Sequence, residues 1–236
     1  MPRVSPDGRI VAHISGLMSD FGSIGGDVWT VPITGGDPVN VTKGQPVTFT
    51  SLAWTRWGLR ASTLQNDKMG AMAIELGRAP RALFAMPVSL AAGDCKIAWD
   101  ATGTTLATIV QDFTHAPAIF AEATIAPRQL THQNDAVAPA VGARSVQWTN
   151  EGYSVQGWLL SPLTSTANMK APMILSVHGG PSAASSPRFV EKGVASAAAD
   201  AGYFLFLPNS RGYYGHGEAG KYRRLLLTTF SCYRTP

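Results

Sequence analysis

The sequence is poor in the residues that mark several large classes of protein. Only two of its 236 residues are cysteines, Cys95 and Cys232, and they are too few and too far apart for a disulfide framework or a zinc site. We therefore expect both to be free thiols. Charged residues make up 14% of the chain, the net charge is +4, and Lys and Arg form no dense patch. Neither a nucleic acid nor a membrane is therefore an expected partner.

Long hydrophobic runs are missing as well. The most apolar region, 194–207, is interrupted by Asp200 and Gly202 and is too short to cross a bilayer. The chain opens on a turn sequence at 1–8 and not on a signal peptide, which favours a cytoplasmic location and indicates that the start of a longer parent is missing. No metal or cofactor is expected, because three histidines have no spacing that suits a metal: His13, His115 and His132.

What the sequence does have, up to about residue 143, is a repeat of short strands and turns. The turn at 5–8 precedes an alternating run at 10–14, and the same pattern returns at 100–110. Three tryptophans stand 45 and 49 residues apart, each just before a turn: Trp54, Trp99 and Trp148. A period of ~40–50 residues with about four strands per unit is typical of β-propeller blades. Residues 1–143 are thus predicted to form about three blades, the C-terminal part of a propeller that needs ~4–8 blades to close. A β-sandwich is the alternative.

The pattern changes near Arg144, where we place a domain boundary. Residues 173–217 contain two apolar runs without alternation, as in strands of a parallel sheet that are buried on both faces. Between them, apolar residues recur at roughly helical spacing: Phe189, Val190, Val194, Ala197, Ala198 and Ala201. Gly202 follows at the position of a helix C-cap. This region is therefore predicted to be one βαβ unit, with a loop after each strand.

The loop after the first of these strands reads His178-Gly179-Gly180-Pro181. Acyl transfer builds negative charge on a carbonyl oxygen, and backbone N–H groups that point at this oxygen stabilise it. A Gly-Gly step lets the backbone turn its N–H groups outward with no Cβ in the way. The oxyanion loop of α/β-hydrolases also has a His-Gly-Gly sequence that follows a strand and precedes a helix. We interpret the loop as an oxyanion turn; a plain strand-to-helix turn is the alternative.

With these motifs the sequence resembles the prolyl oligopeptidase (S9) family of serine peptidases, nearest its acylaminoacyl-peptidase and dipeptidyl-peptidase-like branch. Four features carry the resemblance: a repeat with S-P-D-G and V-W-x-V-P-x-x-G-G patterns, an entry strand at 152–162, the H-G-G-P loop, and the stretch 209–217, which is similar to the family's N-x-R-G-S-x-G-x-G loop. The resemblance covers most of residues 1–222. It implies a mixed fold, the C-terminal part of a β-propeller followed by the first part of an α/β-hydrolase domain at 144–236.

The resemblance also implies a function, the cleavage of short peptides by a Ser-His-Asp triad. The N–H of Gly180 would donate to the oxyanion. In the prolyl oligopeptidase branch a tyrosine of the second loop donates instead, but His216 stands at its position here. Arg211 is expected to be a buried ion-pair residue. The residues that match the two loops are His178, Gly179, Gly180, Pro181, Asn209, Arg211, Gly212, Tyr213 and Gly215.

One departure from the family is decisive for activity: the sequence contains no G-x-S-x-G nucleophile elbow. Ser182, Asp200 and His216 follow in the chain order of such a triad. We reject them because Ser182 lies inside the oxyanion loop and Asp200 ends the connecting helix. The chain as given is therefore expected to be inactive, with only residual effects of the oxyanion hole.

Two other functions and the origin of the C-terminal tail stay open. The chain could be a non-enzymatic propeller that binds a partner, or an esterase or lipase of the same superfamily. Residues 225–236 show neither helix nor strand patterning and are interpreted as a truncated or frame-shifted tail.

Overall fold

The computed structural model describes residues 2–16, 25–91, 93–123, 126–150, 152–166, 170–179, 183–209 and 212–217. All structural statements concern these residues. Cys232 and the tail at 225–236 lie outside them.

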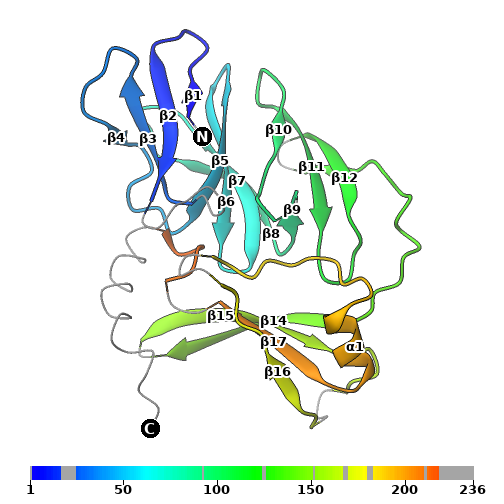
Figure 1. Cartoon of the computed structure of the whole chain (residues 1–236). Coiled ribbons are helices and arrows are strands. Elements are labelled where there is room, and N and C mark those ends of the chain that lie inside the picture. The colour runs from blue at the N-terminus through cyan, green and yellow to red at the C-terminus, as the bar shows by residue number, and fades with distance from the viewer. Residues whose placement is uncertain are drawn as a thin grey trace.

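The described residues up to Gln129 form three antiparallel sheets in chain order, side by side in Figure 1. The first sheet contains β1 (Arg3–Val4), β2 (Ile10–Ser15), β3 (Asp27–Pro32) and β4 (Val39–Asn40). The second contains β5 (Thr48–Thr55), β6 (Gly58–Gln65), β7 (Lys68–Ile74) and β8 (Arg81–Met86). The third contains β9 (Ser89–Leu90), β10 (Ala98–Trp99), β11 (Thr105–Gln111), β12 (Ala118–Ala123) and β13 (Arg128–Gln129).

Local chemistry forms the turns between these strands. In the predicted turn at 5–8, the Gly8 N–H donates to the Ser5 carbonyl at 2.9 Å, and the Ser5 hydroxyl donates to the Asp7 carboxylate at 2.5 Å. The related turn at 100–103 has the same form, because the Gly103 N–H donates to the Asp100 carbonyl at 3.0 Å. Both glycines have a positive φ, 74° and 71°, which a side chain would strain.

The three sheets pack face to face through two apolar cores. The core between the first and second sheets includes Val28, Phe49 and Leu59, all 0% exposed. The core between the second and third includes Leu64, Met69 and Leu90. The second sheet is therefore covered on both faces. Cys95 is a free, buried thiol in the second of these cores, as expected, and burial raises its pKa to about 12.

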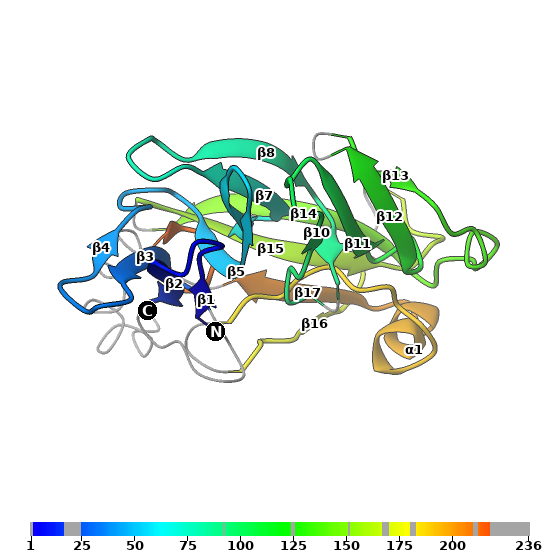
Figure 2. The same cartoon turned by 90° about the horizontal axis from the view of Figure 1, so that it is seen from above.

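A fourth sheet lies below the other three in Figure 1. Its strands are β14 (Gly142–Asn150), β15 (Tyr153–Ser161), β16 (Met173–Leu175) and β17 (Phe204–Asn209), in the spatial order β14-β15-β17-β16. β16 and β17 are parallel, as the βαβ prediction requires, and helix α1 (Val194–Asp200) connects them. Figure 2 shows α1 at one end of this sheet, at the opposite end of the molecule from the first sheet.

Gly202 ends α1 as predicted. It has a φ of 85°, its N–H donates to the Ala199 carbonyl, and the next N–H, of Tyr203, donates to the Ala198 carbonyl, both at 2.9 Å. These two bonds form a Schellman motif.

Two expectations for this region are wrong. β16 was expected to be buried on both faces, but all three of its residues are exposed, because the hydrophobic core of this sheet includes residues of β15, β17 and α1 and does not extend to β16. The helix was expected to include Phe189 and Val190, but it begins at Val194. The Phe189 N–H instead donates to the side chain of Gln111 in the third sheet. A hydrogen bond to a residue far away in the sequence thus takes the place of a bond within a helix.

No helix in the described part of the chain is long and apolar enough to cross a membrane. Over the same residues, no group of three or more potential ligands could hold a metal ion.

Candidate active-site turn and its surroundings

The two predicted loops follow the carboxyl ends of β16 and β17. Because these strands are parallel, both loops begin at the same end of the fourth sheet. His178 and Gly179 follow β16, whose pairing continues to Ser176, since the Ser176 N–H donates to the Phe206 carbonyl at 2.9 Å. The His178 Nε2 atom is buried and has no hydrogen-bond partner among the described residues. Five residues of the predicted loops lie outside the described part: Gly180, Pro181, Ser182, Ser210 and Arg211.

Asn209, the last residue of β17, links the two loops. Its Oδ1 accepts the Ser185 N–H at 2.6 Å, and its Nδ2 donates to the Gln156 Oε1 at 2.6 Å and to the Ser185 carbonyl at 3.2 Å. The Trp158 indole N–H donates to the same carbonyl at 3.1 Å. Asn209 and Gln156 are each 1% exposed. Since buried amides need partners, this network fixes the chain just beyond the candidate turn.

The second loop, Gly212–Gly217, is buried against the second sheet. The Gly215 N–H donates to the Thr48 Oγ1 at 2.8 Å, and the Gly215 carbonyl accepts the Asn66 N–H at 3.1 Å. Tyr214 packs into the core between the second and third sheets. The Tyr213 ring, 1% exposed, lies edge-on to the His216 ring at 4.6 Å between centroids. His216, which the resemblance places at the position of an oxyanion tyrosine, is thus an imidazole that packs against a buried ring.

Asp200 and His216 flank β17 in the sequence. Asp200 is exposed and comes before β17, whereas His216 comes after it. A strand of the six residues of β17 spans roughly 20 Å. The rejection of a triad that combines the two stays a prediction.

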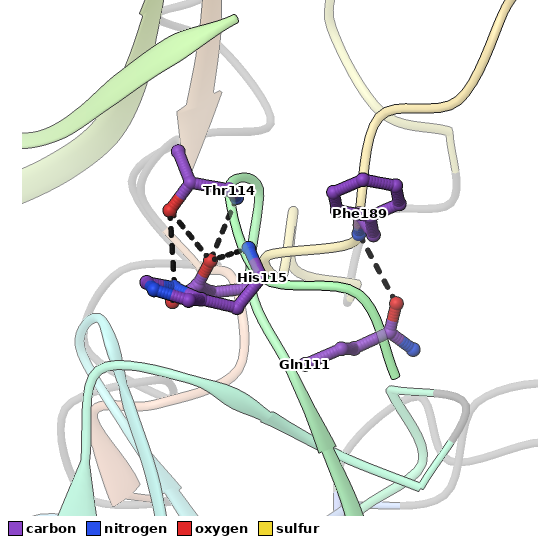
Figure 3. Close-up of polar contacts among 5 residues, drawn as sticks. Gln111, Thr114, His115 and Phe189 are labelled. Atoms are coloured by element: carbon purple, nitrogen blue, oxygen red, sulfur yellow. Dashed lines mark hydrogen bonds and ion pairs between the residues drawn. The ribbon is translucent and has the colours of Figure 1, made fainter. Parts of the chain in front are cut away.

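The loop after β11 contacts the fourth sheet. Figure 3 shows the turn of this loop at Thr114 and His115, and Gln111 at the end of β11 bonded to Phe189. Phe113 enters the core of the fourth sheet, where its ring lies 5.3 Å from the Trp158 ring. The Asp112 carboxylate holds this loop, because it accepts the backbone N–H groups of Thr114 and His115, each at 2.7 Å. Burial acts to raise the pKa of Asp112, but these hydrogen bonds outweigh burial and lower it.

A concave space adjoins the turn. A cavity of about 530 Å³ lies between β17 and the chain that leads to α1, and its lining includes Ser176, Ser185, Arg188 and Leu207. The lining thus combines hydroxyls, the Arg188 guanidinium and the Glu191 carboxylate with an apolar wall.

Several of these residues carried no signal in the sequence. Gln156 stands in an alternating strand, where nothing distinguishes a buried amide from an exposed one, and Gln111 ends a strand. The N-x-R-G pattern did single out Asn209, but for a loop and not for a buried network.

No protein-family model matches the sequence, and no curated protein matches it. Solved structures do match. Acylaminoacyl peptidase of Pyrococcus horikoshii aligns with 92% of this chain at a TM-score of 0.68 and 16% identity. A putative dipeptidyl aminopeptidase IV from Bacteroides ovatus aligns with 93% at 0.64 and 13% identity, and a prolyl endopeptidase with 93% at 0.61 and 12% identity.

The chain shares the fold of these peptidases. The predicted fold class is confirmed: the first three sheets are part of a β-propeller, and the fourth sheet with α1 is the first part of an α/β-hydrolase domain. We call them the propeller part and the hydrolase part. The chain spans about a third of the length of these structures, 33%, 35% and 39% respectively.

Proposed function

We propose that the chain belongs to the prolyl oligopeptidase family of serine peptidases and forms part of an enzyme that hydrolyses short peptides by acyl transfer. One observation carries the proposal: the loops that begin at His178 and after Asn209 follow adjacent parallel strands, in a fold shared with three kinds of peptidase, and residues 212–217 lie against the second sheet of the propeller part. In this reading Gly180 donates to the oxyanion, and a short peptide is the substrate.

The residues of this chain would then hold the substrate carbonyl and not attack it. The sequence contains no G-x-S-x-G elbow, and we reject Ser182, Asp200 and His216 as a triad because Ser182 lies inside the candidate oxyanion loop and Asp200 ends the connecting helix. We therefore propose that this polypeptide alone does not hydrolyse peptides and that the intact parent supplies the nucleophile and its base.

The gene itself gives the test. Sequencing downstream of the codon for Arg211 should reveal a G-x-S-x-G elbow in the same or another frame. The protein from the joined frame should cleave N-acylated peptides and react with a fluorophosphonate, and replacing the elbow serine by alanine should abolish both. A locus with no such elbow would contradict the proposal.

A fluorophosphonate assay on the present chain separates this proposal from its alternatives. We expect no labelling of the wild type, with Ser182→Ala as the matched control. Labelling that disappears in Ser182→Ala would make Ser182 a nucleophile and overturn the assignment above. Saturable binding of peptides by a chain whose gene lacks an elbow would favour a non-enzymatic binding module.

A further inference from the structure

The chain between the candidate turn and α1 is held from two sides. Residues 183–190, the linking segment, form no helix or strand and run between the propeller part above and the hydrolase part below (Figure 1). On the lower side the segment is bound at Ser185. Its N–H donates to the Asn209 Oδ1, and its carbonyl accepts a hydrogen bond from the Asn209 Nδ2.

The propeller part binds the same segment at both of its ends. Ala184 packs against the core between the second and third sheets. The Phe189 N–H donates to the Gln111 Oε1 at 3.1 Å, and the Gln111 Nε2 donates to the Ala91 carbonyl at 3.3 Å (Figure 3). Gln111 thus spans the gap between the third sheet and the segment.

The Gly212–Gly217 loop adds a second route from the propeller part to the segment. At one end, the Tyr214 N–H donates to the Ala183 carbonyl at 3.2 Å. At the other, the Gly215 N–H donates to the Thr48 Oγ1, and Thr48 is 1% exposed. Glycine is required at 217, where a Cβ would lie 2.1 Å from the Gln45 carbonyl oxygen. The loop therefore fits closely against the second sheet. Because the Tyr214 N–H binds the Ala183 carbonyl, the position of the loop also restrains Ala183.

We propose that the propeller part positions the linking segment through two residues, Gln111 and Thr48. This inference rests on the proposed function in one respect: in a peptidase, the segment supports the oxyanion turn. Ala183 is three residues from Gly180 in the sequence, so that fixing Ala183 tethers Gly180 within roughly 11 Å. An oxyanion donor is effective only when it is held in place before the reaction. The propeller would then support the catalytic geometry in addition to covering it.

Hydrogen–deuterium exchange on the whole chain tests the proposal without needing activity. Thr48→Val removes the acceptor for Gly215, and Gln111→Leu removes the acceptor for Phe189. We expect the amides of Ser185 and Phe189 to exchange at least tenfold faster in each variant. Gln111→Glu keeps an acceptor for Phe189, so that exchange of this amide should return towards the wild-type rate.

Two control variants remove similar hydrogen bonds that stay within the propeller part. Thr108→Val loses a bond to the Lys96 carbonyl, and Gln129→Leu loses bonds to Thr131 and Asp135. Both should increase exchange in the third sheet and leave the linking segment unchanged.

Unchanged exchange at Ser185 and Phe189 in Thr48→Val and Gln111→Leu would overturn the proposal. An equal increase in the control variants would overturn it too, because it would show a general loss of stability. The outcome is independent of the gene-sequencing test, so that a failure of the family assignment and a failure of the positioning role can be told apart.

Discussion

β7 and β16 are both short apolar strands, yet one is buried and the other is exposed. β7 has six buried residues after Lys68, since the second sheet has a neighbouring sheet on each face. β16 is exposed at every position, with Leu175 at 58%, because the described hydrophobic core of the fourth sheet does not extend to it. The comparison teaches that burial depends on how many layers surround a strand and not on its own residues.

The largest effect should come from one substitution made in both regions. Leu59→Ala in β6 leaves a cavity in a closed core and should cost about 2–5 kcal/mol of unfolding free energy. Leu175→Ala in β16 should change it by less than about 0.5 kcal/mol. Chemical denaturation followed by tryptophan fluorescence measures both. Equal losses would show that β16 is covered, and the comparison would fail.

The buried amide network is the part of the fourth sheet that should resemble a core. Asn209→Leu leaves the Ser185 N–H and the Gln156 Oε1 without their partner, at a cost of about 1–3 kcal/mol in all. The matched control is Asn134→Leu, which removes an exposed bond to the Pro117 carbonyl and should cost about 0.5 kcal/mol. If Asn209→Leu proved as mild as the control, the network would not stabilise the sheet.

A smaller effect is expected at the end of α1. Gly202→Ala should lower the unfolding free energy by about 1 kcal/mol, because the φ of 85° strains a residue with a side chain and no neighbour lies within 4 Å. Gly202→Asn should cost less, since asparagine tolerates this conformation. Thermal unfolding of the three proteins should rank wild type, Asn, Ala; the reverse order of the two variants would contradict the assignment.

The smallest effect concerns pH and the loop that carries Phe113. The pKa of folded Asp112 lies below its ordinary value of 3.8, so that its carboxylate contributes stability above that value and loses it as the pH falls through the folded pKa. Asp112→Asn should therefore be less stable than the wild type by up to about 1 kcal/mol near neutral pH, with the difference shrinking below about pH 4. Denaturation at several pH values measures this; a difference that grows at low pH would contradict it.

The elements that the sequence predicted well depend on neighbours in the chain. The turn at 5–8, the cap at Gly202 and the parallel pair β16 and β17 follow from residue types at fixed short spacings. In each case the deciding hydrogen bonds join residues that are close in the sequence, or the connection between the strands is a single helix.

The elements that the sequence did not predict depend on distant partners. Asn209 meets Gln156 across 53 residues, Phe189 meets Gln111 across 78, and Gly215 meets Thr48 across 167. No local pattern encodes such pairs, and the helix that was expected from Phe189 failed for this reason. For the candidate site, the sequence singled out the two loops, whose role stays a prediction, but not the residues that bind them.

The most direct test of the peptidase interpretation is a crystal structure of the protein from the complete gene, with a peptide phosphonate attached to the elbow serine. The account predicts that the backbone nitrogen of Gly180 lies about 2.7–3.1 Å from the phosphonyl oxygen, which is the range of an oxyanion donor. A Gly180 N–H that pairs with a neighbouring strand, or that points away from the inhibitor, would contradict it.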